Sequence, residues 1–396
     1  MNLTFCIIVK NEEKNLPRCL ASVKNVVDEI VVLDTGSTDR TPEIAQEFGA
    51  KVHYFEWCND FAAARNESLK YVTGDWVLVL DADEYLSPKI APHIHEAIKS
   101  DRYILINLIR EEIGAQQSPY SLVSRLFRNH PEIKFSRPYH AIVDDSITEI
   151  LAKESHWEIA SLPEIAVLHE GYQKGEITSK NKLQRAKAAM ESYFSNHPND
   201  VYVCSKLGAL YIEIGEKQKG MELLFRGLQD PQIDTTILYE LHYHLAIAYR
   251  QQQDREMAKS HYKTAIELNV MPKLKLGAYN NLGSLLKEEG SLQDAKINYE
   301  IALQIDPNFA VAHYNRGMVL KEIGWFTEAI ASYQKAILLD SNYAEAYQNL
   351  GVVLLKVGQV PESLEAFRKA ISLHEKYNPT EAKRIRQGLE SMGFIL

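Results

Sequence analysis

Hydrophobic positions in the first half of the chain alternate between uninterrupted runs and stretches with helical spacing. Apolar, β-branched runs predict buried strands at residues 3–9, 29–34, 51–57 and 75–81. Apolar residues at helical intervals predict helices at residues 16–26, 41–49 and about 60–71. Strands and helices that alternate in this way form a parallel sheet covered by helices on both faces. The pattern therefore predicts an α/β domain with a mostly parallel sheet.

The second half of the chain repeats its small and aromatic positions at a fixed interval. The interval is 34 residues for Gly283, Gly317 and Gly351, for Gly290, Gly324 and Gly358, for Ala302, Ala336 and Ala370, and for Tyr299, Tyr333 and Phe367. Apolar residues at helical spacing on either side of the second glycine predict a helix–turn–helix unit, with the small residues where two helices cross closely. Weaker copies start at Tyr202 and Leu241, so we expect about five units and a capping helix at residues 379–396.

This period, with a late proline at Pro307, resembles the tetratricopeptide repeat. The resemblance implies an all-α solenoid whose concave face usually holds a peptide or protein. Between the two halves, residues 176–197 have the pattern of one amphipathic helix and no Gly-Ser linker character. We therefore expect an N-terminal domain at residues 1–175, a connecting helix at 176–197 and the repeats at 198–396.

Composition limits the partners and the compartment. A chain of 396 residues with 45% hydrophobic residues and a net charge of −9 is typical of a globular protein, and it argues against nucleic acid or an anionic membrane surface as the main partner. No apolar run approaches the roughly 20 residues of a membrane span, and the first residues lack the pattern of a signal peptide. The four cysteines lack CxxC spacing, which favours a reduced compartment. We expect a cytoplasmic protein that binds small molecules or proteins; whether it forms an oligomer is left open.

Polar loops follow three of the predicted strands, at the edge where parallel sheets bind ligands. In DTGSTDRT, Gly36 permits a tight turn, Ser37 offers a hydroxyl group, and Asp34 is placed to accept a hydrogen bond from a base or a ribose. The alternative is a capped turn from strand to helix that binds nothing.

The sequence DADE follows the predicted strand at residues 75–81. Successive residues of a strand point to opposite faces, so Asp81 and Asp83 project to one side. Adjacent carboxylates repel each other unless a cation lies between them, and hard cations such as Mg²⁺ or Mn²⁺ prefer oxygen ligands. A metal at this position would neutralise a departing diphosphate. The alternative is an acid-rich turn that ends a strand.

Four ordered blocks within residues 3–172 resemble the family 2 glycosyltransferases of GT-A, Rossmann-like fold: FCIIVKNEEKNLPRCLASV, DEIVVLDTGSTDRT, DFAAARNESLKYVTGDWVLVLDADEYL and SRLFRN. The chain also resembles the small group in which tetratricopeptide-like helices follow such a domain, a group that includes bacteriocin S-glycosyltransferases. The resemblance implies a hexosyltransferase with a nucleotide-sugar donor, most often a UDP-sugar, a divalent metal and inversion at the anomeric carbon. The residues that it places around the nucleotide are Asn11, Glu12, Asp34, Gly36, Ser37, Arg65, Asn66 and Asp81.

The resemblance also implies metal ligands. It makes Asp83 the direct ligand, with Asp81 supporting the ribose or the metal. The later stretch AVLHEGYQKG is similar to the family's His-Gly-Tyr region, so His169 is the second expected ligand, the alternative being a structural histidine.

The chain departs from the family at Ala141, where the family commonly has the acid that serves as catalytic base. The remaining candidates for the base are Asp144, Asp145 and His140. Residue 144 can replace the missing acid only if the strand ends or bends before it. A second interpretation follows, in which the domain has lost turnover and the chain is an interaction scaffold. The intact Asp81, Asp83, Asp34 and His169 favour the enzyme, because an inactive site has no physical reason to keep adjacent charges that are costly.

Overall fold

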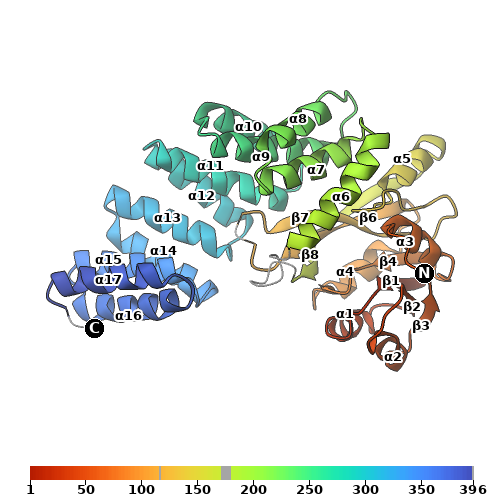
Figure 1. Ribbon diagram of the computed structural model, residues 1–396, viewed down its shortest axis with the longest axis horizontal. Coiled ribbons are helices and arrows are strands. Elements are labelled where there is room, and N and C mark those ends of the chain that lie inside the picture. The colour runs from red at the N-terminus through yellow and green to blue at the C-terminus, as the bar shows by residue number, and fades with distance from the viewer. Residues whose placement is uncertain (116, 171–179, 395–396) are drawn as a thin grey trace. The chain divides into compact units, whose positions relative to one another are not determined.

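The computed structural model describes residues 1–115, 117–170 and 180–394 (Figure 1). Contacts divide the chain into two compact units, Met1–Ile233 and Asp234–Leu396. The α/β domain and the first helices after it belong to the first unit. The domain boundaries expected at residues 175 and 197 stay a prediction. None of the helices described is long and apolar enough to cross a membrane.

The first unit contains a mixed sheet. The strands are Leu3–Val9 (β1), Glu29–Asp34 (β2), Lys51–Tyr54 (β3), Trp76–Val79 (β4), Glu84–Leu86 (β5), Tyr103–Glu112 (β6), Tyr120–Arg128 (β7) and Glu158–His169 (β8), in the order β3-β2-β1-β4-β7-β6-β8-β5. Strands β3, β2, β1 and β4 are parallel, as the sequence predicts. Strand β7 is antiparallel to both β4 and β6, and β5 is antiparallel to β8, whereas β6 and β8 are parallel. The predicted α/β class is confirmed, and the described sheet is mixed: parallel from β3 to β4 and mostly antiparallel beyond β4.

Helices cover both faces of this sheet. They are Leu16–Val23 (α1), Thr41–Glu47 (α2), Phe61–Leu69 (α3), Ala91–Ala97 (α4) and Asp144–Lys153 (α5). Three helices follow the last strand and pack against one another: Lys180–Asn196 (α6), Val201–Glu213 (α7) and Lys217–Gly227 (α8). Along β1, Phe5 and Ile7 pack on one face with residues of α1, α2 and α4, while Cys6 packs on the other with residues of α3 and α5. This alternation is the period of two that a strand buried on both faces requires.

One expected strand is shorter than its apolar run. Strand β4 ends at Val79, and residues 81–83 form a turn before β5. The expectation that strand alternation puts Asp81 and Asp83 on one side is therefore wrong in its premise. The turn instead sends the two carboxylates to different partners.

The second unit is all-helical, and its helices follow one another in antiparallel pairs. They are Thr235–Gln251 (α9), Arg255–Glu267 (α10), the 3₁₀ helix Pro272–Lys275 (η1), Leu276–Glu288 (α11), Leu292–Ile305 (α12), Ala310–Ile323 (α13), Phe326–Leu339 (α14), Ala344–Lys356 (α15), Val360–Tyr377 (α16) and Pro379–Ser391 (α17). The 34-residue period has a packing cause, because the glycines that recur in α11, α13 and α15 each lie against an aromatic ring of the next helix. The predicted repeat fold is confirmed.

Replacing Gly317 with leucine is expected to destabilise the repeats by about 1–3 kcal/mol, the usual cost of overpacking. A Cβ atom there would lie 2.7 Å from the ring of Tyr333, which is fully buried. The control is Gly388→Leu in α17, where a Cβ atom meets nothing within 4 Å. Thermal unfolding followed by circular dichroism should show a lower midpoint only for Gly317→Leu. Equal midpoints for the two variants would contradict the packing account.

A histidine pair joins α9 and α10. The Nδ1 atoms of His242 and His261 lie 2.9 Å apart, and the ring of Tyr249 stacks on His261. Burial and the neighbouring His261 lower the pKa of His242 from 6.5 to about 4. Between these values His242 of the unfolded chain binds a proton that His242 of the folded chain does not, so the contribution of this residue to stability is fully present above about pH 6.5 and is lost as the pH drops toward 4.

The midpoint of thermal unfolding is therefore expected to fall between pH 6.5 and pH 4, and His242→Gln should remove part of this fall. The control is His95→Gln, which replaces an exposed histidine of α4. An identical pH profile for His242→Gln and the wild type would show that the pair does not carry the effect.

Candidate functional site

The loops after β1 and β2 form one hydrogen-bonded edge. The backbone N–H of Asn11 donates to Oγ of Ser37 at 2.9 Å, and the N–H of Thr38 donates back to Oδ1 of Asn11 at 2.8 Å. The N–H of Glu12 donates to Oγ1 of Thr41 at 2.8 Å. These contacts fix both loops beyond the carboxyl ends of their strands, where ligands bind in such sheets.

Asp34, the last residue of β2, lies at the floor of this edge. Its Oδ1 accepts from the backbone N–H groups of Gly36 and Ser37, both at 2.9 Å, around a turn in which Gly36 has a φ of +101°. Its Oδ2 is buried and has no hydrogen-bond partner among the described residues. A buried carboxylate oxygen without a partner is costly, so this atom is suited to accept a hydrogen bond from a ligand.

Asp81 is clamped by two arginines, of which Arg65 is buried and Arg125 is partly buried. Its Oδ1 lies 2.5 Å from Nη2 of Arg65 on α3, and its Oδ2 lies 2.8 Å from Nη2 of Arg125 on β7. Burial raises the pKa of Asp81, but Arg125 and Arg65 outweigh it and hold the pKa well below its usual range. The Nη1 group of each arginine is buried without a partner among the described residues. Beside the fixed carboxylate there are thus two donors suited to an anion such as a phosphate.

Asp83 faces the end of β8. Its Oδ2 lies 3.2 Å from Nε2 of His169, and Nδ1 of His169 lies 2.5 Å from Oε2 of Glu112 on β6. Burial lowers the pKa of His169, but the hydrogen bonds to Asp83 and Glu112 outweigh it and raise the pKa to about 9. A carboxylate on the far nitrogen of a histidine ring is the usual way to orient a metal-binding imidazole.

Arg110 on β6 forms ion pairs with two glutamates, one beside Asp81 and one beside His169. Its Nη1 lies 2.8 Å from Oε1 of Glu84, and its Nη2 lies 2.7 Å from Oε1 of Glu112. Glu84 is buried, and its Oε2 accepts from the backbone N–H of Asp81 at 2.9 Å. The sequence reasoning assigned no role to Arg110, Glu112, Glu84 or Arg125. The only signal was that charged residues end or interrupt otherwise apolar strands.

Asp83 and His169 fit a divalent ion in part. Adjacent ligands of an octahedral ion with bonds of about 2.1 Å lie about 3 Å apart, close to the observed separation of 3.2 Å. Burial raises the pKa of Glu12, and the charges of Asp83 and Asp81 add to this, so negative charge accumulates here. In the described part of the chain no group of three or more His, Cys, Asp or Glu residues could hold a metal ion. Further ligands would have to come from donor phosphates and water, as is usual for Mg²⁺.

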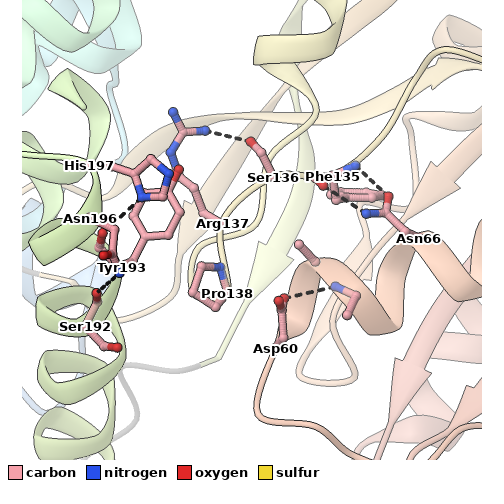
Figure 2. Close-up of a pocket in the computed structure, with 12 residues that line it drawn as sticks. Asp60, Asn66, Phe135, Ser136, Arg137, Pro138, Ser192, Tyr193, Asn196 and His197 are labelled. Atoms are coloured by element: carbon pink, nitrogen blue, oxygen red, sulfur yellow. Dashed lines mark hydrogen bonds between the residues drawn. The ribbon is translucent and has the colours of Figure 1, made fainter. Parts of the chain in front are cut away.

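Two residues expected near the nucleotide have structural contacts. Arg65 is buried and paired with Asp81. Asn66 donates from Nδ2 to the carbonyl oxygen of Phe135 at 2.9 Å and accepts from its N–H at 2.7 Å, as Figure 2 shows. Asn66 thus holds the backbone of Phe135. Gly171 and Tyr172, which supported His169 in the sequence, lie outside the described residues.

The three candidate bases have different surroundings. Asp144 is the first residue of α5, so the preceding strand has ended before it. Its Oδ1 accepts a hydrogen bond from Oγ of Ser124 at 2.8 Å. Its Oδ2 has no hydrogen-bond partner among the described residues. Burial raises the pKa of Asp144. Asp145 is bound in two places by Arg137, at 2.7 and 3.1 Å. His140 is exposed, with a φ of +52°.

Comparison with known proteins identifies both halves. A family model described as glycosyl transferase family 2 matches residues 4–160. Tetratricopeptide repeat models match residues 239–269, 276–309, 319–358 and 344–379. A TPR repeat-containing protein of Synechococcus elongatus is 42% identical over 290 residues, which is 73% of this chain and 72% of that protein. The chain belongs to the proteins that join a family 2 glycosyl transferase domain to tetratricopeptide repeats.

Other relatives match a shorter part of the chain, a little under half of its length. The SPbeta prophage-derived glycosyltransferase SunS of Bacillus subtilis is 30% identical over 187 residues, 46% of this chain and 43% of SunS. An uncharacterized glycosyltransferase of Rickettsia felis is 29% identical over 194 residues, 47% of this chain and 68% of that protein. The family predicted from the four sequence blocks is confirmed.

Proposed function

We propose that the chain transfers a hexose from a nucleotide sugar, with a UDP-sugar as the first candidate, to a peptide or protein acceptor, by a metal-dependent, inverting reaction in the cytoplasm. The observation that carries this proposal is the arrangement of acids, arginines and His169 around the turn at residues 81–83. The acceptor class is supported by the repeats, because concave repeat surfaces usually bind extended protein segments.

At the nucleotide end, Oδ2 of Asp34 accepts a hydrogen bond from the base or the ribose. This role gives the buried oxygen the partner that it lacks among the described residues. Hydrogen bonds join the loops at residues 10–13 and 35–41, and they hold the turn that orients Asp34.

At the diphosphate end, Asp83 and His169 would hold a divalent ion, and Glu112 keeps the imidazole ring oriented. When bound, the ion supplies positive charge that stabilises the departing diphosphate. Arg65 and Arg125 hold Asp81 in place and present their unpaired N–H groups to phosphate oxygens.

Inverting transfer needs a base that takes the acceptor's proton. Of the three candidates, Asp144 suits this role best. Its raised pKa makes it a stronger base than an ordinary aspartate, and its Oδ2 has no hydrogen bond to give up among the described residues. The carboxylate of Asp145 forms an ion pair with Arg137, which makes it a weaker candidate for the base.

The proposal is tested by isothermal titration calorimetry, which measures the binding of UDP, GDP and their sugar conjugates to the full chain with and without Mn²⁺. We expect one nucleotide to bind at least tenfold more tightly with Mn²⁺, and we expect slow hydrolysis of its sugar conjugate. Binding of none of these nucleotides would overturn the proposed function and favour the scaffold interpretation.

A further inference from the structure

Residues 136–142 form a closed loop at the edge of the transferase domain. The backbone N–H of Ser136 donates to the carbonyl oxygen of Ile142 at 2.9 Å, and the N–H of Ile142 donates back at 3.3 Å. Within the loop, Arg137 and His140 have positive φ angles of 73° and 52°. Non-glycine residues seldom adopt this conformation, so surrounding contacts must hold the loop in it.

Arg137 supplies the charged contacts of this loop, and the N–H of Phe61 donates to the carbonyl oxygen of Pro138 at 3.0 Å. The side chain of Arg137 is buried; Nε lies 2.9 Å from Oδ2 of Asp200, and Nη1 and Nη2 donate to the two carboxylate oxygens of Asp145. Asp145 lies in the first turn of α5, and Asp200 caps α7 by accepting from the N–H of Val203 at 3.0 Å. A planar guanidinium with a bidentate partner is the most directional ion pair available to a protein.

Side-chain packing alone does not fix this loop. Figure 2 shows Arg137 and Pro138 between Tyr193 of α6 and the following His197 on one side and Asp60 and Asn66 of the α3 region on the other. These residues line a cavity of about 550 Å³. Close packing holds a segment only where neighbouring atoms fill the space, so a loop beside a cavity has room to shift unless directional contacts restrain it.

The loop carries Tyr139, which packs against residues of α6, α7 and α8 and meets an aromatic ring of α3. The ring of Tyr139 lies 5.9 Å from that of Phe61, which lies 4.9 Å from Trp57. Phe61 and Arg65 are four residues apart on α3 and so share a face, and Arg65 binds Asp81. Burial and the charge of Asp81 raise the pKa of Tyr139. The three aromatic rings thus form a row that starts one helical turn from Arg65, whose side chain reaches Asp81.

We propose that Arg137 is a positioning residue for sugar transfer: it fixes the loop at residues 136–142 so that Tyr139, Phe61 and Trp57 form a wall that keeps water away from the bound sugar. This inference rests on the proposed function. Without the wall, the oxygen of water bonds to the anomeric carbon as the bond to the diphosphate oxygen breaks. One proton of the water is released, and the free sugar and the nucleoside diphosphate leave.

The test compares Arg137→Gln, Arg137→Lys and Tyr139→Ala with the wild type. Hydrolysis of UDP-glucose, UDP-N-acetylglucosamine and GDP-mannose is measured with Mn²⁺, and the Kd of UDP and GDP is measured by titration. We expect hydrolysis to rise about tenfold in Arg137→Gln and Tyr139→Ala, with Kd within about twofold of the wild type. Arg137→Lys keeps the charge but loses the bidentate geometry, so its hydrolysis rate should lie between the rates of the wild type and Arg137→Gln.

The matched control is Lys153→Gln, which removes the exposed ion pair with Glu132 on the same domain. It should hydrolyse at the wild-type rate. Tyr139→Ala leaves both ion pairs of Arg137 in place, so it tests the wall even if Arg137→Gln does not fold. Unchanged or slower hydrolysis in folded variants that bind the nucleotide normally would overturn the inference, whereas a wild type that binds no nucleotide overturns the proposed function itself.

Discussion

Replacing Asp83 with alanine is expected to lower turnover of the nucleotide sugar about 10³-fold and to abolish the Mn²⁺ dependence of nucleotide binding. The ion would lose one of the two ligands that face each other at 3.2 Å, and with it the several kcal/mol by which a metal stabilises a departing diphosphate. Titration of the protein with Mn²⁺ alone and with Mn²⁺ plus UDP measures the binding. Hydrolysis of the accepted donor measures the turnover.

Two further variants make this prediction specific. Asp101→Ala removes an aspartate whose side chain is 88% exposed, and it should leave both measurements unchanged. Glu112→Gln removes the negative charge that orients His169, so it should weaken Mn²⁺ binding about 10–100-fold without removing a ligand. Donor binding that is insensitive to Asp83→Ala would refute the metal role of this residue.

Local patterns explain why the elements of the fold could be predicted. Strands β1, β2 and β4 are buried on both faces and therefore appear as continuous apolar runs. In the repeats, Gly283, Gly317 and Gly351 recur because each must accommodate an aromatic ring 16 residues later. Sheet order has no such local signal. That β7 lies antiparallel between β4 and β6 depends on connections and long-range pairing.

The candidate site was predictable where its residues follow one another in the chain. Asp34 with Gly36 and Ser37, and Asp81 with Asp83, lie in short loops that end strands. Their partners come from elsewhere, because β-sheet pairing brings Glu112 opposite His169, which is 57 residues away. No spacing rule connects such residues, so the role of Glu112 becomes visible only in the folded chain.

The same limit applies to the loop around Ala141. In the sequence, Asp144 and Asp145 are adjacent and equivalent candidates for the base. In the structure Asp144 turns toward Ser124 of β7, while Asp145 turns toward Arg137. Successive residues of a helix point about 100° apart, so the first turn of α5 sends two neighbouring carboxylates to different surroundings.

Replacing Asp144 with asparagine is expected to lower turnover of the accepted donor about 10²–10⁴-fold, the usual contribution of a general base. The pH dependence should identify the role. A base must be ionised, so the wild-type rate should rise with pH through the pKa of Asp144, which burial raises above its ordinary value. The Asp144→Asn variant should lose this rising limb while its affinity for UDP with Mn²⁺ stays within about twofold.

Asp145→Asn is the matched comparison, because it makes the same chemical change one residue away. It weakens only the ion pair with Arg137, so it should behave like a mild form of Arg137→Gln and keep the rising limb of the pH profile. His140→Gln tests the third candidate in the same assay. If both asparagine variants retain wild-type turnover, neither aspartate is the base; a rising limb lost only in His140→Gln would then transfer the role to His140.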